Sequence, residues 1–126
     1  MTYTLHIPAP EAWLSSNDRW HWAKRARVTK AWREAAAWRA IAGKLPIGLS
    51  RVSITASVHR ADNRRADAHN RLPTIKAAID GLVDAGVIPD DNDSIVSALT
   101  IVAGEAVRAP GQARGRLTLT IREVTA

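Results

Sequence analysis

The sequence predicts one small α/β domain in which a mixed β-sheet is packed by two helices, in the order β-α-β-α-β-β. Three observations lead to this fold class. Four segments have the apolar patterns of strands, two segments between them carry apolar residues at helical spacing, and 126 residues suffice for one modest core. We expect a single domain over residues 1–126, because no repeat, linker or low-complexity segment divides the chain.

Strand patterns occur at residues 2–7, 51–59, 95–102 and 116–124. Three of these segments alternate apolar and polar side chains, which predicts strands with one buried face. The segment 95–102 is more continuously apolar, so we expect it to be a more buried strand. The residues expected to face the core from the alternating strands are Tyr3, Leu5, Ile7, Val52, Ile54, Ala56, Val58, Leu117, Leu119 and Ile121.

The first helix is predicted over about residues 30–42. Thr29 is a suitable N-cap and Gly43 a suitable stop, and residues 11–28 before them are predicted to form a loop. The inward face of this helix is expected to hold Ala31, Ala35, Trp38 and Ala42, with Trp32 at its border.

The second helix is predicted over about residues 73–85. Pro73 suits a first helical turn and Gly86 suits the end of a helix. The apolar stripe expected to face the core consists of Ile75, Ile79, Leu82 and Val83.

The composition is strongly basic, with 18 Lys and Arg against 12 Asp and Glu, a formal net charge of +6 and a pI near 10.8. Arginine makes up 14 of the 18 cations. Its planar donor fork matches phosphate oxygens and stacks on bases, so this bias favours nucleic-acid binding. The alternative interpretation is a soluble protein that is basic without a polyanionic partner.

The composition also excludes several classes of site. The chain has no cysteine, which rules out disulfides, thiolate zinc sites and cysteine nucleophiles, and which suits a reducing cytoplasm. The N-terminus lacks the basic start and apolar run of a signal peptide. No run of about 18 apolar residues occurs, so we expect no membrane partner.

Acidic residues are concentrated in one part of this basic chain. Seven of the twelve lie between positions 62 and 93, and all seven are aspartates. Repulsion between these carboxylates would oppose such crowding unless a cation lies among them. Hard oxygen ligands on a basic surface are typical of a magnesium-dependent nuclease. The seven are Asp62, Asp67, Asp80, Asp84, Asp90, Asp91 and Asp93.

Two of these aspartates are the main candidates for a metal site. Asp67 follows a predicted strand and precedes a helix, and Asp91 follows that helix and precedes the next strand. Loop positions fixed by rigid elements are where functional residues usually lie. Asp90 is a further candidate ligand beside Asp91. Turn and cap chemistry is the alternative for all of them, and we favour it for Asp93.

A helix over about 73–85 is roughly 20 Å long, so Asp67 and Asp91 would lie beyond its opposite ends. Joint binding of one ion then requires one of two arrangements. Either the flanking loops fold back toward each other, or a two-fold dimer runs this helix antiparallel to its copy. The second arrangement would bring Asp67 of one chain near the partner's Asp91.

Lys76 and His69 each allow more than one role. Lys76 lies one helical turn before Asp80, which suits either an ordinary ion pair or a cation that stabilises charge on a scissile phosphate. His69 follows Asp67 by two residues and could be a metal ligand, a general acid or base, or a loop histidine without such a role.

The segment from residue 17 to residue 30 interleaves cations with indoles. Such a segment can clamp phosphates and stack on unpaired bases, whereas the alternative is that Trp20 and Trp22 anchor the core. All five tryptophans lie in the first 38 residues of a chain without phenylalanine, so several must pack the core. The polar and cationic members are Asn17, Arg19, His21, Lys24, Arg25, Arg27 and Lys30.

Three stretches of the chain form a recognisable combination of motifs. They are Ser16-Asn17-Asp18-Arg19, then Asp67-Ala-His-Asn70 with Lys76-Ala-Ala-Ile-Asp80 and Asp90-Asp91, and finally Leu117-Thr-Leu-Thr-Ile121. In this order, and over nearly the whole chain, they resemble the RusA family of Holliday junction resolvases. The most specific part of the resemblance is residues 64–91.

The resemblance implies a RusA-like α/β homodimer that cuts four-way DNA junctions symmetrically with Mg²⁺ or Mn²⁺. It implies that Asp67 and Asp91 are metal-binding catalytic carboxylates and that Lys76 is the catalytic lysine. Such proteins are common in phages and prophages, which implies the cytoplasm of a bacterium or of a phage-infected host. The residues implied to bind branched DNA are Asn17, Arg19, Lys24, Arg25, Arg27, Arg64, Arg65 and Asn70.

The chain departs from the family's pattern at one position. The family typically has Asp-x-Asp-Asn, whereas His69 stands here in place of the second carboxylate. About three extra residues, near Arg71 to Thr74, also precede the helix lysine. Asp62 or Asp90 could compensate for the missing carboxylate. If His69 binds the metal, the enzyme should favour Mn²⁺ over Mg²⁺.

The sequence therefore leads to three functional hypotheses. The first is a metal-dependent endonuclease that resolves four-way junctions by paired phosphodiester cleavage. The alternative is a branched-DNA-binding module with weak or no catalysis. The third is a less selective nuclease that acts on flaps or single strands.

Overall fold

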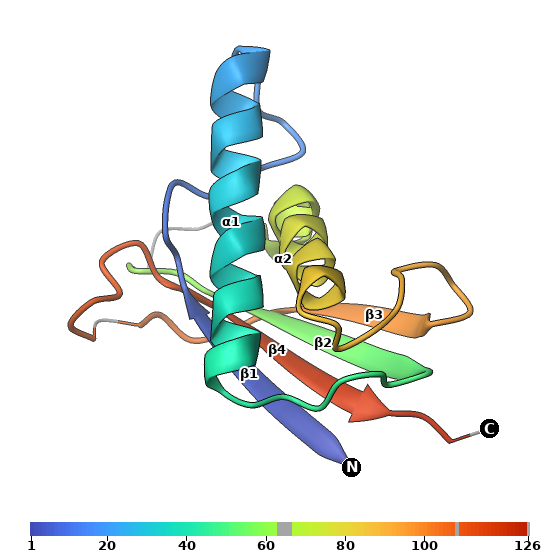
Figure 1. Cartoon of the computed structure of the whole chain (residues 1–126). Coiled ribbons are helices and arrows are strands. Elements are labelled where there is room, and N and C mark those ends of the chain that lie inside the picture. Colours follow the sequence, from blue (N-terminus) through green and yellow to red (C-terminus); the bar gives the residue numbers. More distant parts are fainter. Residues whose placement is uncertain (63–66, 108, 126) are drawn as a thin grey trace.

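A computed structural model describes residues 1–62, 67–107 and 109–125 of the chain. The order of its elements confirms the predicted β-α-β-α-β-β arrangement (Figure 1), with one additional short 3₁₀ helix, η1, before the second α-helix. The elements are β1 (Thr2–Pro8), α1 (Trp22–Ala42), β2 (Val52–His59), η1 (Ala68–Arg71), α2 (Leu72–Asp84), β3 (Val96–Ala103) and β4 (Arg116–Glu123).

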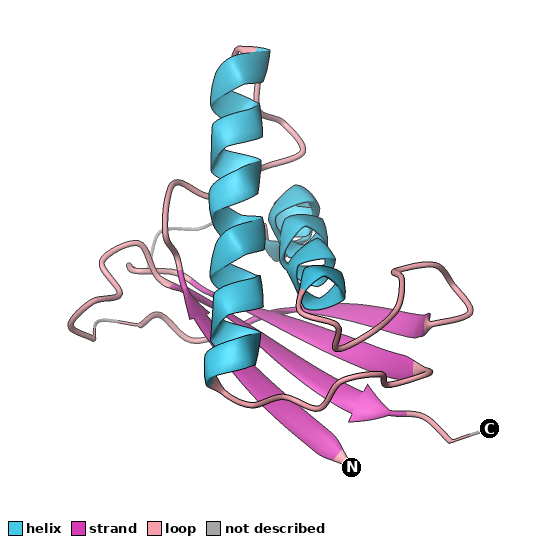
Figure 2. Cartoon of the chain, in the orientation of Figure 1, coloured by secondary structure: helices cyan, strands magenta, loops and turns pink. Residues whose placement is uncertain are grey.

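The sheet is mixed, as predicted, and its strand order is β1-β4-β2-β3. Strand β4 pairs antiparallel with both β1 and β2, whereas β3 pairs parallel with β2. A parallel pair needs a crossover connection, and α2 lies in the one that joins β2 to β3. Figure 2 shows both helices on the same face of the sheet, so the domain has two layers.

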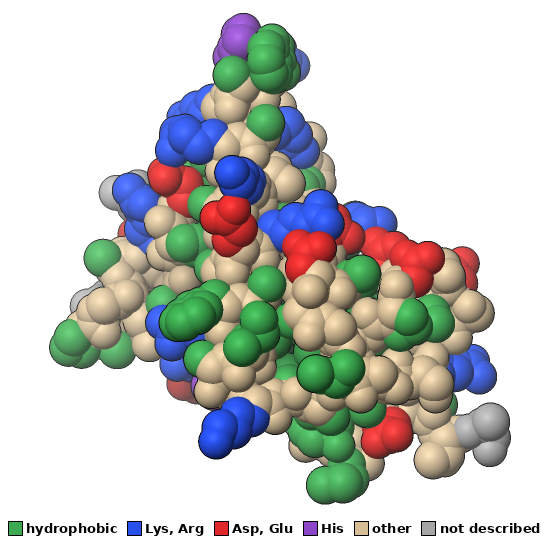
Figure 3. Space-filling model, in the orientation of Figure 1, with side chains coloured by type: hydrophobic (Ala, Val, Ile, Leu, Met, Phe, Trp, Pro, Cys, Tyr) green, Lys and Arg blue, Asp and Glu red, His purple; other side chains and the backbone are tan. Residues whose placement is uncertain are grey.

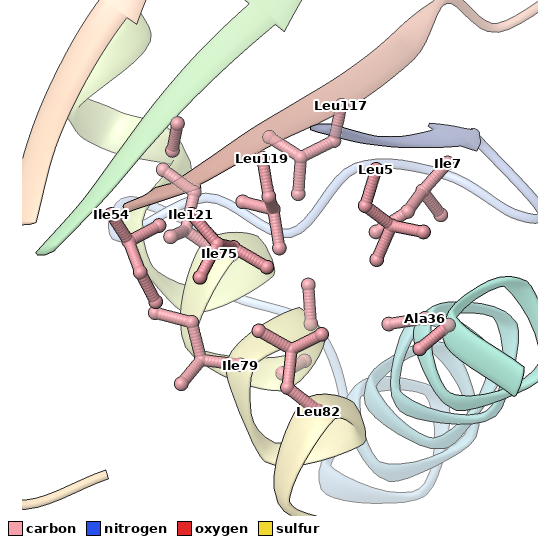
Figure 4. Packing of buried hydrophobic residues seen from close by; sticks show 14 of the residues in the cluster. Leu5, Ile7, Ala36, Ile54, Ile75, Ile79, Leu82, Leu117, Leu119 and Ile121 are labelled. Carbon is pink, nitrogen blue, oxygen red and sulfur yellow. The ribbon is translucent and has the colours of Figure 1, made fainter. Parts of the chain in front are cut away.

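The core lies between the sheet and the two helices (Figure 4). The alternation predicted for three of the strands is confirmed, because nearly all of the side chains expected to face inward are buried, and Tyr3 is half-buried. The α2 stripe is confirmed for Ile75, Ile79 and Leu82, while Val83 is half-buried. Burial of these side chains is the main term that holds the layers together.

The first helix is longer than predicted. It begins at Trp22 and not after Thr29, and its N-cap is His21, whose Nδ1 accepts a hydrogen bond from the Ala23 amide at 3.2 Å. Thr29 lies inside the helix, where its hydroxyl donates to the Arg25 carbonyl at 2.7 Å. The first turns carry no apolar stripe because they extend away from the sheet (Figure 1), so periodicity gave no signal there.

The predicted inward face of α1 was also wrong. Trp38 is 68% exposed, and Trp32, which we expected at the border, is fully buried. The indole of Trp32 donates to the Ala12 carbonyl at 2.9 Å and lies 4.7 Å from the Trp13 ring, measured between ring centroids. The side chains that α1 buries are Val28, Trp32, Ala36 and Ala40.

The two helices approach closely at Gly81 of α2. A β-carbon at this position would collide with the carbonyl oxygen of Arg33 and would lie 2.7 Å from the Ala36 β-carbon. Only glycine therefore allows the backbones to come this near without a shift of either helix. The close approach also places Arg33 beside Asp84, with which it forms an ion pair.

Strand β3 is not the buried strand that its apolar sequence predicted. It pairs only with β2 and is therefore an edge of the sheet. Most of its residues are exposed, including Leu99 at 37% and Val102 at 40%. An exposed apolar edge strand is a ready template for pairing with another chain.

Candidate functional site

A groove of about 270 Å³ lies between α2 and the first half of β3. It brings together two of the predicted catalytic residues, Lys76 from α2 and Asp91 from the turn that leads into β3. Its other polar lining includes Asp93, and apolar side chains from both elements form its walls. The lining residues are Leu72, Lys76, Ile79, Asp91, Asp93, Val96, Ser97, Ala98 and Leu99.

The electrostatic environment of Asp80 links α2 to this groove. Partial burial raises the pKa of the Asp80 carboxyl, and the nearby negative charge of Asp91 raises it further. Arg33 and Lys76 act in the opposite direction. Asp80, Asp91 and Lys76 therefore lie within electrostatic reach of one another, and the ammonium of Lys76 offsets part of the repulsion between the two carboxylates.

Asp84 has a structural role at the crossing of the helices. Arg33 Nε lies 2.6 Å from Asp84 Oδ2, and Arg33 Nη2 lies 2.8 Å from Asp84 Oδ1. This two-point hydrogen bond lowers the pKa of Asp84 and raises that of Arg33. Both carboxylate oxygens of Asp84 are engaged, so we do not place it among the candidate metal ligands.

The carboxylate of Asp90, a predicted ligand, accepts hydrogen bonds from within its own turn. Its Oδ1 accepts from the Asp91 amide at 2.7 Å, and its Oδ2 accepts from Asn92 Nδ2 at 3.1 Å. These hydrogen bonds, led by the one from the Asp91 backbone, lower the pKa of Asp90. The turn fixes the backbone from which Asp91 projects into the groove, so the geometry favours a positioning role for Asp90 over a ligand role.

Asp67 lies at another place in the fold. It is the N-cap of η1, and its Oδ1 accepts from the His69 amide at 3.0 Å and lies 3.3 Å from His69 Nδ1. Asp67 also lines a small pocket with Val58, Arg60 and Ala103, at the C-terminal ends of β2 and β3. A carboxylate that contacts one imidazole nitrogen orients the other outward, as is common for metal-binding histidines.

Asp67 and Asp91 therefore flank opposite ends of β3. The strand has eight residues, which corresponds to a span of about 23 Å at 3.3 Å per residue. Asp67 and Asp91 line separate pockets toward the two ends of β3, and this favours the second of the two arrangements predicted for joint metal binding over the first. In the part of the chain that the structure describes, no three side chains of His, Cys, Asp or Glu form a group able to hold a metal ion.

Three of the predicted DNA-binding residues, Lys24, Arg25 and Arg27, lie in the first two turns of α1, and Arg19 lies in the loop before it. Arg27 is held by Glu11 at 2.9 Å, and Lys24 lies over the Trp20 ring at 4.2 Å from its centroid. Arg19 is exposed. Arg25 is half-buried.

The remaining predicted DNA-binding residues lie in the preceding turn, at η1 and in the segment before η1. Asn17 is exposed in the turn. Asn70 anchors this turn, because its carbonyl accepts from the Ser16 amide at 2.8 Å. Arg64 and Arg65 lie outside the described residues.

One residue of functional interest was not found from the sequence, and another was found but placed in the wrong element. Asp93 was assigned to the turn alone, yet it lines the groove with Asp91. Trp22 was assigned to a loop, yet it lies at the exposed start of α1. No sequence signal identified Asp93, because its position depends on a turn held by the side chains of Asp90 and Asn92.

The chain matches no protein-family model, and no curated protein matches it significantly. None of the described helices is long and apolar enough to cross a membrane.

Proposed function

We propose that this protein is a metal-dependent, structure-selective endonuclease that resolves four-way DNA junctions by paired phosphodiester cleavage. The observation that supports it most is the groove that gathers Lys76, Asp91 and Asp93 beside an exposed sheet edge. Metal-dependent cleavage of DNA requires carboxylates that bind a hard cation, a cationic side chain for a phosphate oxygen, and positive charge that attracts the polyanion. The groove offers the first two, and the chain has a net charge of +6.

We propose further that the site is completed by a second copy of the chain. Leu72 and Leu99 line the groove and are each 37% exposed, although apolar side chains favour burial. Antiparallel pairing of β3 with its copy would cover these side chains and pair the free edge of the sheet. Such pairing places the start of one β3 beside the end of the other.

The same two-fold arrangement brings Asp91 of one chain toward the partner's Asp67, because these residues flank opposite ends of β3. It also accounts for the lack of a three-ligand group among the described residues of a single chain. A symmetric dimer has two such sites, which is the number that paired nicks in a four-way junction require.

The donors in the groove fit a magnesium ion. Mg²⁺ is usually bound through one or two carboxylates and keeps several waters, which Asp91 and Asp93 could satisfy before the partner's Asp67 is added. When bound, the ion supplies Lewis-acid activation of the phosphodiester. Lys76 donates to a non-bridging phosphate oxygen and balances the negative charge that develops there.

A branched-DNA-binding module with weak or no catalysis is the rival proposal. A labelled synthetic four-way junction, incubated with Mg²⁺, with Mn²⁺ or with EDTA, distinguishes the two. We expect nicking with either ion and none with EDTA. Binding of the junction in all three conditions without any nick would support the rival.

The same assay tests the third hypothesis and the role of His69. We expect the junction to be cut in preference to flap, single-strand and linear duplex substrates. If the imidazole of His69 reaches the ion, cleavage by the wild type is faster with Mn²⁺ than with Mg²⁺. Equal activity of His69→Ala and wild type with both ions would exclude His69 as a ligand.

A further inference from the structure

The N-terminal half of α1 forms an arm that extends beyond the rest of the domain (Figure 1). Between Trp22 and Ala31 only Val28 is buried. The end of the arm carries His21 and Trp22, whose ring centroids are 5.5 Å apart. Trp22 is 75% exposed. Figure 3 shows a histidine and apolar side chains at this end and Lys and Arg below it.

A shallow groove of about 590 Å³ follows one face of this arm. Its wall is largely apolar, and three cations line it at intervals of three to five residues. Trp22 and Arg33 are eleven residues apart, which corresponds to about 17 Å along the helix axis. The lining residues are Trp22, Arg25, Ala26, Thr29, Lys30 and Arg33.

The groove leads from the exposed indole toward the candidate site. Arg33 at its inner end binds Asp84 at the C-terminal end of α2. Asp80, one helical turn earlier on α2, lies near Lys76 and Asp91. A ligand that lies along the arm would therefore extend toward the groove between α2 and β3.

Exposure alone does not distinguish Trp22, because Trp38 on the same helix is 68% exposed. The charge on its face of the helix distinguishes Trp22 from Trp38. The first turn of α1 contains no acidic residue, and Arg25 and Lys30 line the same groove as the indole. An indole among cations is the combination that binds unpaired nucleotides, because the ring stacks on a base while the cations bind phosphates.

We propose that this groove binds unpaired nucleotides of a branched nucleic acid, with a base stacked on Trp22 and phosphates bound by Arg25 and Lys30. The inference rests on the proposed function, since it assigns part of the same substrate to a second site. A strand with one negative charge per phosphate complements the cations of the groove. A second copy of the arm would instead bring Arg25 and Lys30 against like charges.

Substitution of Trp22 tests the stacking contact. Binding of a fluorescent oligothymidine is measured by anisotropy in EDTA, so that no cleavage contributes. We expect Trp22→Ala to weaken binding about tenfold, Trp22→Phe to retain most of the affinity, and Trp38→Ala to bind as the wild type does. Equal affinities of Trp22→Ala and Trp38→Ala would overturn the proposal.

The dependence of binding on salt tests the phosphate contacts. Each phosphate contact to a single strand contributes about 0.7 to the slope of log affinity against log salt. We expect the double variant Arg25→Gln with Lys30→Gln to lower this slope by about 1.4. Arg39→Gln with Lys44→Gln removes the same charge from the last turn of α1 and the turn after it, and should leave the slope unchanged. Equal losses of slope in both double variants would contradict a site in the groove.

The outcome is separable from that of the proposed endonuclease. The wild type could nick no substrate while Trp22→Ala alone loses oligothymidine binding. That result would support this inference and contradict the endonuclease. A protein that nicks junctions but binds oligothymidine equally well in both alanine variants would retain the endonuclease and reject this inference. Dissociation of a dimer in Trp22→Ala, measured by sedimentation, would show that the arm contacts a second copy and would also overturn the inference.

Discussion

Replacing Asp91 with asparagine is expected to lower the rate of junction cleavage about a thousandfold while leaving junction binding intact. The change keeps the shape of the side chain and removes the charge that holds the cation. Metal activation contributes several kcal/mol to transition-state stabilisation, and three factors of ten correspond to about 4 kcal/mol. Asp67→Asn should have an effect of similar size, because we propose that both carboxylates bind one ion. Single-turnover cleavage of a labelled junction measures the rate, and a gel shift in EDTA measures binding.

Asp90→Asn is the matched control for these variants. It removes the same charge one residue away, and its side-chain oxygen can still accept the hydrogen bond from the Asp91 amide, although the one from Asn92 Nδ2 is lost. We expect it to retain most of the cleavage activity. If Asp90→Asn abolishes cleavage and Asp91→Asn does not, the carboxylate that binds the ion is Asp90 and the assignment made from the groove is wrong.

Trp32→Ala is expected to lower the free energy of unfolding by about 3–5 kcal/mol. The side chain is fully buried, lies 4.7 Å from the Trp13 ring between centroids and donates to the Ala12 carbonyl. Its loss leaves a large cavity and a carbonyl without its donor. For a chain of this length the midpoint of thermal unfolding should fall by about 10–20 °C. Circular dichroism during a thermal scan measures the change.

Trp38→Ala deletes the same atoms from the same helix at an exposed position. We expect it to change the free energy of unfolding by less than about 0.5 kcal/mol. Similar midpoints for Trp32→Ala and Trp38→Ala would show that Trp32 is not a core anchor. That result would contradict the face of α1 that the structure assigns to the core.

Periodicity predicted most of the fold and failed where side chains have no buried face. The alternating strands and the α2 stripe were correct because burial imposes a period of two or of 3.6 on the sequence. The arm of α1 extends into solvent, so its residues follow no such period, and only the helix propensity of Lys, Arg and Ala could have indicated it. Strand β3 was misjudged because an exposed apolar edge strand has the same composition as a buried strand.

The candidate site was only partly predictable for a geometric reason. The length of α2 already implied that Asp67 and Asp91 lie far apart, and the structure places them beside opposite ends of β3. The position of Asp93 depends on a turn held by the side chains of Asp90 and Asn92, which sequence spacing does not specify. Whether Trp22 is buried or exposed depends on where α1 begins, and that was the element boundary predicted least well.

In the proposed dimer, each site takes Asp67 from one chain and Asp91 from its partner. Mixing the inactive variants Asp67→Asn and Asp91→Asn tests this arrangement, because a mixed dimer would contain one site with both substitutions and one intact site. Random mixing makes about half of the dimers mixed, and one of the two sites in each mixed dimer is intact. About a quarter of the wild-type nicking activity should therefore return.

The measurement is the initial rate of single nicks in a labelled junction, with the two variants co-expressed under different affinity tags and the mixed dimers purified through both. We predict that purified mixed dimers nick at about half the wild-type rate, whereas either variant alone does not nick. Mixed dimers without activity, beside an active wild type, would show that both carboxylates act within one chain or that they do not share an ion, and would rule out a site shared between chains.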